Sequence, residues 1–99
     1  MSVFPKRLKE ARLRAGLTQE KLGVLAGIDE MSASARMNQY EREKHAPDWL
    51  TIKRIAKVLD VPVAYFIAVE DDTATLLLHF HALPAELRSR ALTLISQLR

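Results

Sequence analysis

The sequence predicts an all-α protein, and three observations support that prediction. The 99 residues contain only three glycines, and runs of alternating apolar and polar residues are almost absent. Long stretches are rich in Ala, Leu, Lys, Arg and Glu, which favour helices. Apolar residues also recur at the spacing of a helix face in several segments. A chain of this length supports one ordinary hydrophobic core rather than two.

Residue usage narrows the class of protein further. The absence of cysteine excludes a disulfide scaffold and a thiolate metal site. The first residues lack the apolar core of a signal peptide, and no apolar run reaches membrane-spanning length. His79 and His81 are two positions apart, so on a helix they point in different directions and cannot bind one metal ion. We therefore expect a cytoplasmic protein without enzyme activity, metal or cofactor.

The net charge of +3 is modest, but the charges are unevenly placed. Residues 1–60 carry twelve Lys and Arg against eight Asp and Glu, whereas residues 61–99 carry three against four. A basic N-terminal part beside a nearly neutral, Leu-rich part indicates a polyanion-binding unit followed by a packing unit. A basic face that is only solvated would give the same balance, so charge alone leaves both interpretations open.

Helix start and stop signals divide the chain into seven predicted helices. Thr18 and Asp48 are strong N-caps, and Gly27 fits the position that ends a helix. Either Asp29 or Ser32 could cap the third helix, and the sequence does not decide between them. The predicted helices cover residues 6–15, 19–26, 33–42, 49–59, 62–68, 74–81 and 84–98.

Apolar spacing marks the inward face of these helices. In the third helix Ala33, Met37 and Tyr40 are expected to face the core. In the first helix Lys6 and Arg7 are expected on solvated faces. The other residues predicted to be buried are Leu8, Ala11, Leu22, Leu25, Ala26, Leu50, Ile52, Ile55, Ala56, Leu59, Val63, Phe66 and Ile67.

Polar side chains share the outward face of the third predicted helix. Ser34, Asn38 and Gln39 point away from the core, with Ala35 beside them. Such residues can be ordinary surface, but Ser, Asn and Gln also suit hydrogen bonding to base edges in a major groove. Gln19 lies in the first turn of the second helix, where free backbone N–H groups favour an anion such as phosphate.

The C-terminal part carries more apolar surface than a small domain needs to cover. Leucines at Leu76, Leu77 and Leu78 precede a stripe in the last predicted helix. This stripe either folds back onto its own domain or forms a two-fold dimer, and its spacing is typical of a helix that packs against a partner. We predict dimerisation, through Leu83, Leu87, Ala91, Leu94 and Leu98.

The chain resembles the lambda-repressor/Cro-type helix-turn-helix domains, regulators that are also called xenobiotic-response-element-like. The resemblance covers residues 6–68. The matching pieces are residues 8–12, 16–20, 26–28, 40–42, 50–59, 61–62 and 65–66, with Leu22, Lys44 and Pro47 between them.

This resemblance implies a five-helix bundle in which the second and third helices bind DNA, the third lying in the major groove. It implies base contacts from Ser34, Ala35, Arg36, Asn38 and Gln39. It implies contacts to the DNA backbone from Gln19, Arg42, Lys44 and His45. It also implies a structural ion pair between Arg12 and Glu41, and Arg12 independently needs a carboxylate because it lies beside an apolar stripe.

Two features depart from the family pattern. The segment between Gly27 and Glu41 is longer than in the commonest members, so residues 29–32 either lengthen the turn or add a turn to the third helix. The second departure is Glu43, where the family usually has glycine. Counting back from Glu41 fixes Asn38 and Gln39 more firmly than Ser34.

We therefore expect a DNA-binding domain over residues 1–69 and a C-terminal helical extension over residues 70–99 that dimerises. The predicted function is a homodimeric transcriptional regulator, most simply a repressor, that binds double-stranded DNA at an inverted-repeat operator. The alternative is a protein-interaction module such as an antitoxin, whose C-terminal helices bind a partner protein.

Overall fold

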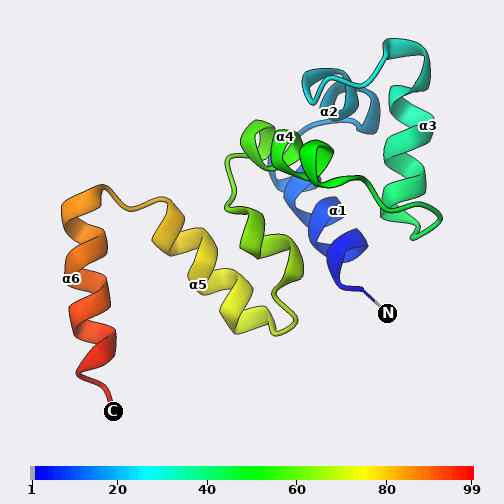
Figure 1. Cartoon of the computed structure of the whole chain (residues 1–99). Coiled ribbons are helices and arrows are strands. Elements are labelled where there is room, and N and C mark those ends of the chain that lie inside the picture. Colours follow the sequence, from blue (N-terminus) through cyan, green and yellow to red (C-terminus); the bar gives the residue numbers. More distant parts are fainter. Residues whose placement is uncertain (1) are drawn as a thin grey trace.

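The computed structural model describes residues 2–99, and this part of the chain contains six α-helices, one 3₁₀ helix and no strand. The all-α prediction is confirmed. Figure 1 shows helices α1 to α4 grouped together, with α5 and α6 leading away from them. The elements are α1 (Phe4–Arg14), α2 (Gln19–Leu25), α3 (Glu30–Glu41), α4 (Trp49–Leu59), the 3₁₀ helix η1 (Val63–Ile67), α5 (Asp71–His81) and α6 (Ala85–Ser96).

One apolar core holds the first four helices and η1 together. Its largest fully buried side chains come from α1, α2, α3, α4 and η1. Burying each such side chain contributes about 1.5–3 kcal/mol. These residues are Leu8, Leu22, Met37, Ile55, Tyr65 and Phe66.

Helices α2 and α3 cross at very short range. Gly23 lies on α2 against Ala33 of α3, and a Cβ atom placed on Gly23 would stand 2.8 Å from the Cβ atom of Ala33. The turn between the helices includes Gly27 with φ of +91°, a backbone conformation that glycine adopts without steric cost. The two helices therefore form one tightly joined unit.

Helix α3 begins three residues earlier than the sequence predicts. Asp29 is its N-cap, and the Asp29 carboxylate accepts a hydrogen bond of 3.0 Å from the backbone N–H of Met31. The predicted start at Ala33 is wrong, because this cap starts the helix at Glu30. The extra residues between Gly27 and Glu41 thus add a turn to the helix rather than lengthening the connection.

Several predicted burial states also differ from the structure. Leu25 and Ile67 are exposed by 50% and 73%, because each lies on the outer side of its short helix. Leu50 is also exposed, since it stands in the first turn of α4 at the edge of the core. Arg7, expected on a solvated face, is buried with 2% exposure.

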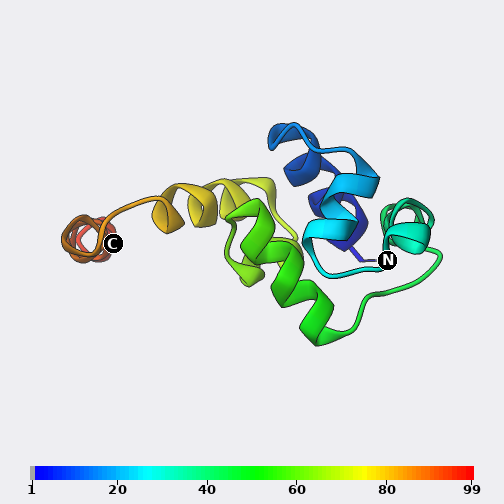
Figure 2. The ribbon, with the colours of Figure 1, turned by 90° about the horizontal axis from the view of Figure 1, so that it is seen from above.

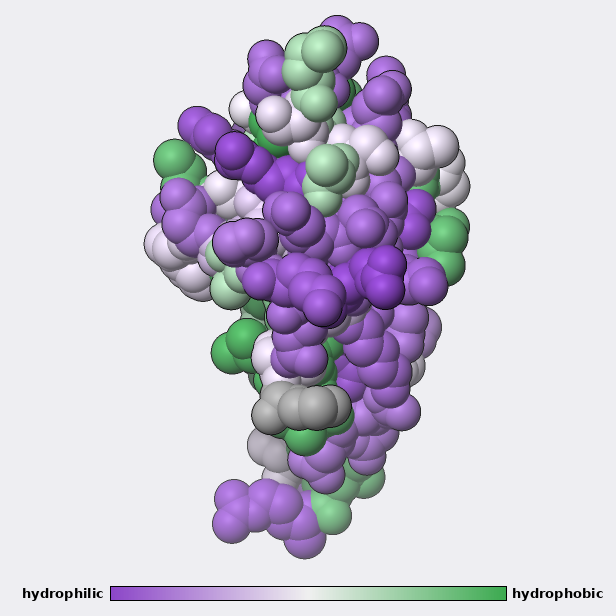
Figure 3. All heavy atoms as spheres, turned by 90° about the vertical axis from the view of Figure 1, so that its right-hand side faces the viewer, coloured by the Kyte–Doolittle hydropathy of each residue, from purple (hydrophilic) through white to green (hydrophobic). Residues whose placement is uncertain are grey.

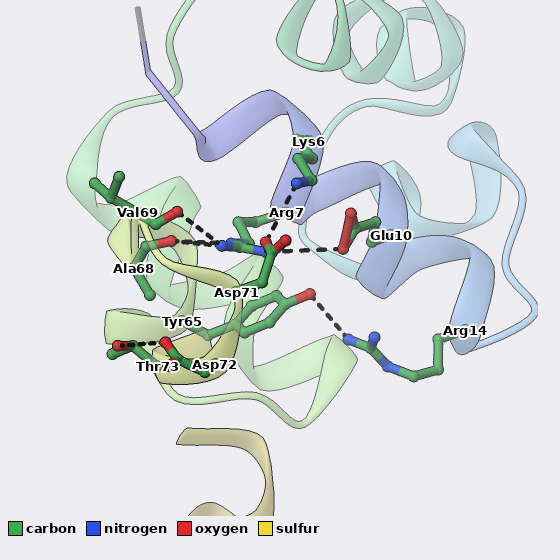
Figure 4. Close-up of polar contacts among 10 residues, drawn as sticks. All are labelled: Lys6, Arg7, Glu10, Arg14, Tyr65, Ala68, Val69, Asp71, Asp72 and Thr73. Carbon is green, nitrogen blue, oxygen red and sulfur yellow. Dashed lines mark hydrogen bonds and ion pairs between the residues drawn. The ribbon is translucent and has the colours of Figure 1, made fainter. Parts of the chain in front are cut away.

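The burial of Arg7 has a clear physical cause in the chain after η1. Figure 4 shows its guanidinium between the backbone carbonyls that follow η1 and the start of α5. Its Nε and Nη2 atoms donate to the carbonyl of Ala68 at 3.0 and 2.8 Å, and Nη1 lies 3.0 Å from the Asp71 carboxylate. Arg7 therefore joins α1 to the point where α5 begins.

Helix α6 stands apart from the helical group, as Figures 1 and 2 both show. None of its residues is buried. Arg88 fixes its start by donating to the carbonyls of Phe80 and His81 at 3.2 and 2.9 Å. The radius of gyration of 15.0 Å exceeds the value of about 13 Å typical of a compact domain of this length. The molecule is accordingly elongated, with extents of 50 × 28 × 22 Å.

The predicted last helix is slightly too long. It ends at Ser96, and Leu98 lies beyond it, in a final turn where its backbone N–H bonds only the carbonyl of Ile95. Such tightening of the last turn is common where helices fray. None of the helices in residues 2–99 has both the length and the apolar character needed to cross a membrane.

Candidate nucleic-acid interface

Helix α3 has one buried face and one polar face open to solvent. Ala33, Met37 and Tyr40 are buried, as their spacing predicts. Ser34, Ala35, Arg36 and Gln39 are exposed, and Asn38 is half-buried. Figure 3 looks onto the side of the molecule where α3 lies, and that side is mostly hydrophilic.

One hollow beside α3 brings together three residues of the expected interface. Arg36 and Gln39 of α3 line it with His45 of the following loop, and Tyr40 and Ala46 form the rest of its surface. The backbone N–H groups of Lys44 and His45 both bond the carbonyl of Gln39, at 2.9 and 3.4 Å. The loop is thus held against the C-terminal end of α3.

A second hollow lies between α3 and the start of α2. Gln19, Asn38 and Arg42 line it, together with Lys9 of α1. The sequence analysis did not select Lys9, although it lies three positions before Arg12 and so on the same face of its helix. Ser34 and Ala35 lie in neither hollow.

Arg12 and Glu41 form a nearly buried pair beneath this second hollow. Arg12 Nε donates to Glu41 Oε2 at 2.6 Å and Nη2 donates to Glu41 Oε1 at 3.1 Å. Arg12 Nη1 also donates to the carbonyl of Leu17 at 2.9 Å, so the same guanidinium holds the loop before α2. The pair therefore connects α1, the loop before α2 and the end of α3.

Gln19 is turned toward α3 rather than outward. Its Nε2 atom donates to Glu41 Oε1 at 3.1 Å and to Asn38 Oδ1 at 3.3 Å. Because an amide nitrogen carries two hydrogens, these two bonds use both side-chain donors of Gln19. Only its backbone N–H, in the first turn of α2, is left to donate to an anion.

The loop after α3 contains an unusual backbone conformation. Glu43 has φ of +61°, in the left-handed region that favours glycine. This explains why glycine is usual here and marks Glu43 as a departure with a cost in backbone strain. The conformation turns the chain sharply between Arg42 and Lys44, both of which are exposed.

Asp48 ends this loop and starts α4. Its carboxylate accepts a hydrogen bond of 2.8 Å from the backbone N–H of Thr51. Hydrogen bonds from the side chain and the backbone of Thr51 lower the pKa of Asp48. Within residues 2–99, no group of three or more His, Cys, Asp or Glu side chains is placed to hold a metal ion.

Comparison with known proteins identifies the family. A family model described as helix-turn-helix matches residues 8–66, more than half of the chain. The chain belongs to the lambda-repressor/Cro-type helix-turn-helix family. In this helix-turn-helix protein α2 and α3 are the two helices of the motif, and the turn at Gly27 joins them.

A solved structure extends the likeness over nearly the whole molecule. The crystal structure of the transcriptional regulator BswR shares 48% sequence identity with a TM-score of 0.89, over 98% of this chain and 94% of that one. The likeness therefore includes α5 and α6 as well as the helix-turn-helix unit. No curated protein matches the sequence.

Proposed function

We propose that this helix-turn-helix protein is a transcriptional repressor that binds an inverted-repeat operator as a homodimer. The observation that carries the proposal is the division of α3 into a buried apolar face and an exposed polar face, on a helix held rigidly against α2. Its family and its likeness to a transcriptional regulator support DNA binding.

In this proposal α3 supplies sequence readout in the major groove. Side-chain donors and acceptors there distinguish base pairs, whereas contacts to phosphate fix position and supply strength. The proposed base contacts are Ser34, Ala35, Arg36, Asn38 and Gln39. The proposed backbone contacts are Arg42, Lys44 and His45, with Gln19 acting through its main-chain N–H.

The C-terminal extension supplies the dimer contact in this proposal. Leu87 and Leu94 of α6 are exposed, and Leu83 and Ala91 are half-buried, so a second copy has apolar surface to cover. A two-fold dimer would present two α3 helices to successive major grooves, about 34 Å apart. We therefore propose residues 1–69 as the DNA-binding unit and residues 70–99 as the dimerisation unit, acting in the cytoplasm.

A pair of variants tests the division between base and backbone contacts. Gln39→Ala is expected to weaken operator binding by about 1–3 kcal/mol and to relax preference at one base position. Lys44→Ala is expected to weaken binding on operator and random DNA alike and to reduce the slope of log K against log salt. Equal loss on both DNAs for Gln39→Ala, or an unchanged salt slope for Lys44→Ala, would contradict these assignments.

A second candidate function rests on the same exposed apolar surface of α6. A partner protein, as in a toxin–antitoxin pair, would cover that surface equally well. Purification from the native host separates the candidates, because a stoichiometric second protein bound through α5 and α6 would favour the antitoxin. A homodimer without such a protein favours the simple repressor.

A further inference from the structure

Asn38 is not free to present its amide in either orientation, and the constraint begins at Glu41. The Glu41 side chain is only 3% exposed and its carboxylate binds Arg12. A carboxylate in such a pair accepts hydrogen bonds and donates none. Any amide that contacts Glu41 must therefore present its nitrogen.

Gln19 transmits this constraint to Asn38. Its Nε2 atom lies 3.1 Å from Glu41 Oε1, and the reversed amide would bring two acceptor oxygens together. The orientation of Gln19 is thus fixed by chemistry rather than by choice of rotamer. Its second N–H then points to Asn38, whose Oδ1 lies 3.3 Å away. Asn38 must turn its oxygen toward Gln19 to accept that bond.

The Asn38 amide group consequently faces outward as a donor. Among residues 2–99, the Nδ2 atom of Asn38 forms no hydrogen bond, whereas Oδ1 already accepts one. An asparagine that pairs with adenine uses its oxygen and its nitrogen together, accepting from N6 and donating to N7. Guanine instead offers two acceptors, N7 and O6, and thymine offers the acceptor O4.

We infer that Asn38 reads a base edge that presents acceptors, guanine or thymine, and discriminates against adenine because Gln19 and Glu41 fix its amide as a donor. This inference rests on the proposed function, since it assigns a preference to one of the proposed base contacts. Gln19 and Glu41 are positioning residues in it: they act on DNA sequence through Asn38.

Selection of bound sequences from random DNA, with the full chain, tests the inference. The wild-type protein and Asn38→Ala are compared to find the base position whose preference depends on Asn38. Guanine or thymine at that position in the wild-type selection is the expected result. Adenine there, or no position that depends on Asn38, would overturn the inference.

Gln19→Met then tests the positioning role, because methionine has similar length and cannot donate to Asn38. Its affinity is measured on two operators that differ only at the Asn38-dependent position. Discrimination against adenine is expected to fall about tenfold, the order of one bidentate base contact. An unchanged ratio of the two affinities would refute the positioning role. The ratio is measured on one preparation, so partial loss of folded protein cancels.

Glu20→Met is the matched control. Glu20 is the neighbouring residue of α2, is exposed, and makes no hydrogen bond through its side chain within residues 2–99. Its ratio of affinities should equal that of the wild type, and a change as large as that of Gln19→Met would overturn the inference. If selection with the wild type enriches no sequence at all, the proposed function itself fails. An enriched operator with adenine at the Asn38 position leaves that function intact and refutes only the base assignment.

Discussion

Gly23 and Ala33 are so close that no larger residue fits at Gly23 without movement. A Cβ atom on Gly23 would lie 2.8 Å from the Cβ atom and 3.0 Å from the backbone oxygen of Ala33. Both residues are buried, and both belong to helices of the DNA-binding unit. The approach of α2 to α3 therefore depends on the absence of a single methyl group.

Gly23→Ala is accordingly expected to destabilise the fold by about 1–3 kcal/mol, the usual cost of overpacking, despite the higher helix propensity of alanine. Denaturant unfolding measures this loss. Lys21→Ala, at an exposed position of the same helix, should change stability by no more than about 0.5 kcal/mol. A Gly23→Ala protein as stable as the wild type would mean that the two helices can separate freely.

Arg7→Met is expected to destabilise the fold by about 2 kcal/mol, because it leaves the buried carbonyl of Ala68 without its charged donor. Lys6→Met is a matched control, since Lys6 contacts the same Asp71 carboxylate but is exposed. Surface pairs of that kind contribute little, so no clear change is expected. Equal effects of the two substitutions in denaturant unfolding would contradict the structural role of Arg7.

The Asp71 carboxylate makes stability depend on acidity. Hydrogen bonds from Lys6 and then Arg7, with their positive charges, lower its pKa in the folded protein. A lowered folded pKa means that the stabilising contribution is present above the unfolded value, about 3.9, and is lost as pH falls through the folded value. The difference in unfolding midpoint between wild type and Asp71→Asn should therefore shrink as pH falls below about 4.

Asp72 provides the comparison for this pH dependence. It lies in the same first turn of α5 and forms no ion pair within residues 2–99. Asp72→Asn is expected to stay close to the wild type across the same pH range. A gap between wild type and Asp71→Asn that is constant with pH would mean that the contacts with Lys6 and Arg7 do not stabilise the fold.

Leu94→Glu is expected to convert the proposed dimer into a monomer without unfolding it, because Leu94 is already exposed by 57% in the single chain. Leu92→Glu is closely matched, since Leu92 has the same exposure but lies about 140° around the helix from the centre of the proposed stripe. Sedimentation equilibrium gives the mass of each variant. Loss of the dimer in both variants, or in neither, would remove the stripe from the interface.

Local signals were enough to predict much of the fold. Ala33, Met37 and Tyr40 recur at helical spacing, and the structure buries all three. Thr18 and Asp48 cap α2 and α4 through bonds of 3.0 and 2.8 Å, as their residue types predict. Such features depend on neighbours within one or two turns of the chain.

Features set by distant segments could not be predicted in the same way. Arg7 is buried because carbonyls more than sixty residues further on accept from it, and nothing near Arg7 in the sequence indicates them. Two candidate caps left the start of α3 open, and the structure selects Asp29. Gly23 gave no pattern of its own, since its role depends entirely on where Ala33 lies.

The candidate site follows the same division. The outward face of α3 could be read from periodicity and from the family resemblance. The inward turn of Gln19 could not, because it follows from a hydrogen-bond network that joins Asn38, Glu41 and Arg12 in space. Lys9 was missed for a related reason, since only the packing of α1 beside α3 brings it to the hollow.

Selection of bound sequences from random DNA tests the central claim most directly. A homodimer that reads DNA with two α3 helices should enrich an inverted repeat whose half-site centres are about 10 base pairs apart, or a multiple of that spacing. Enrichment of a single half-site, or of no sequence at all, would contradict the account of this protein as a dimeric operator-binding regulator.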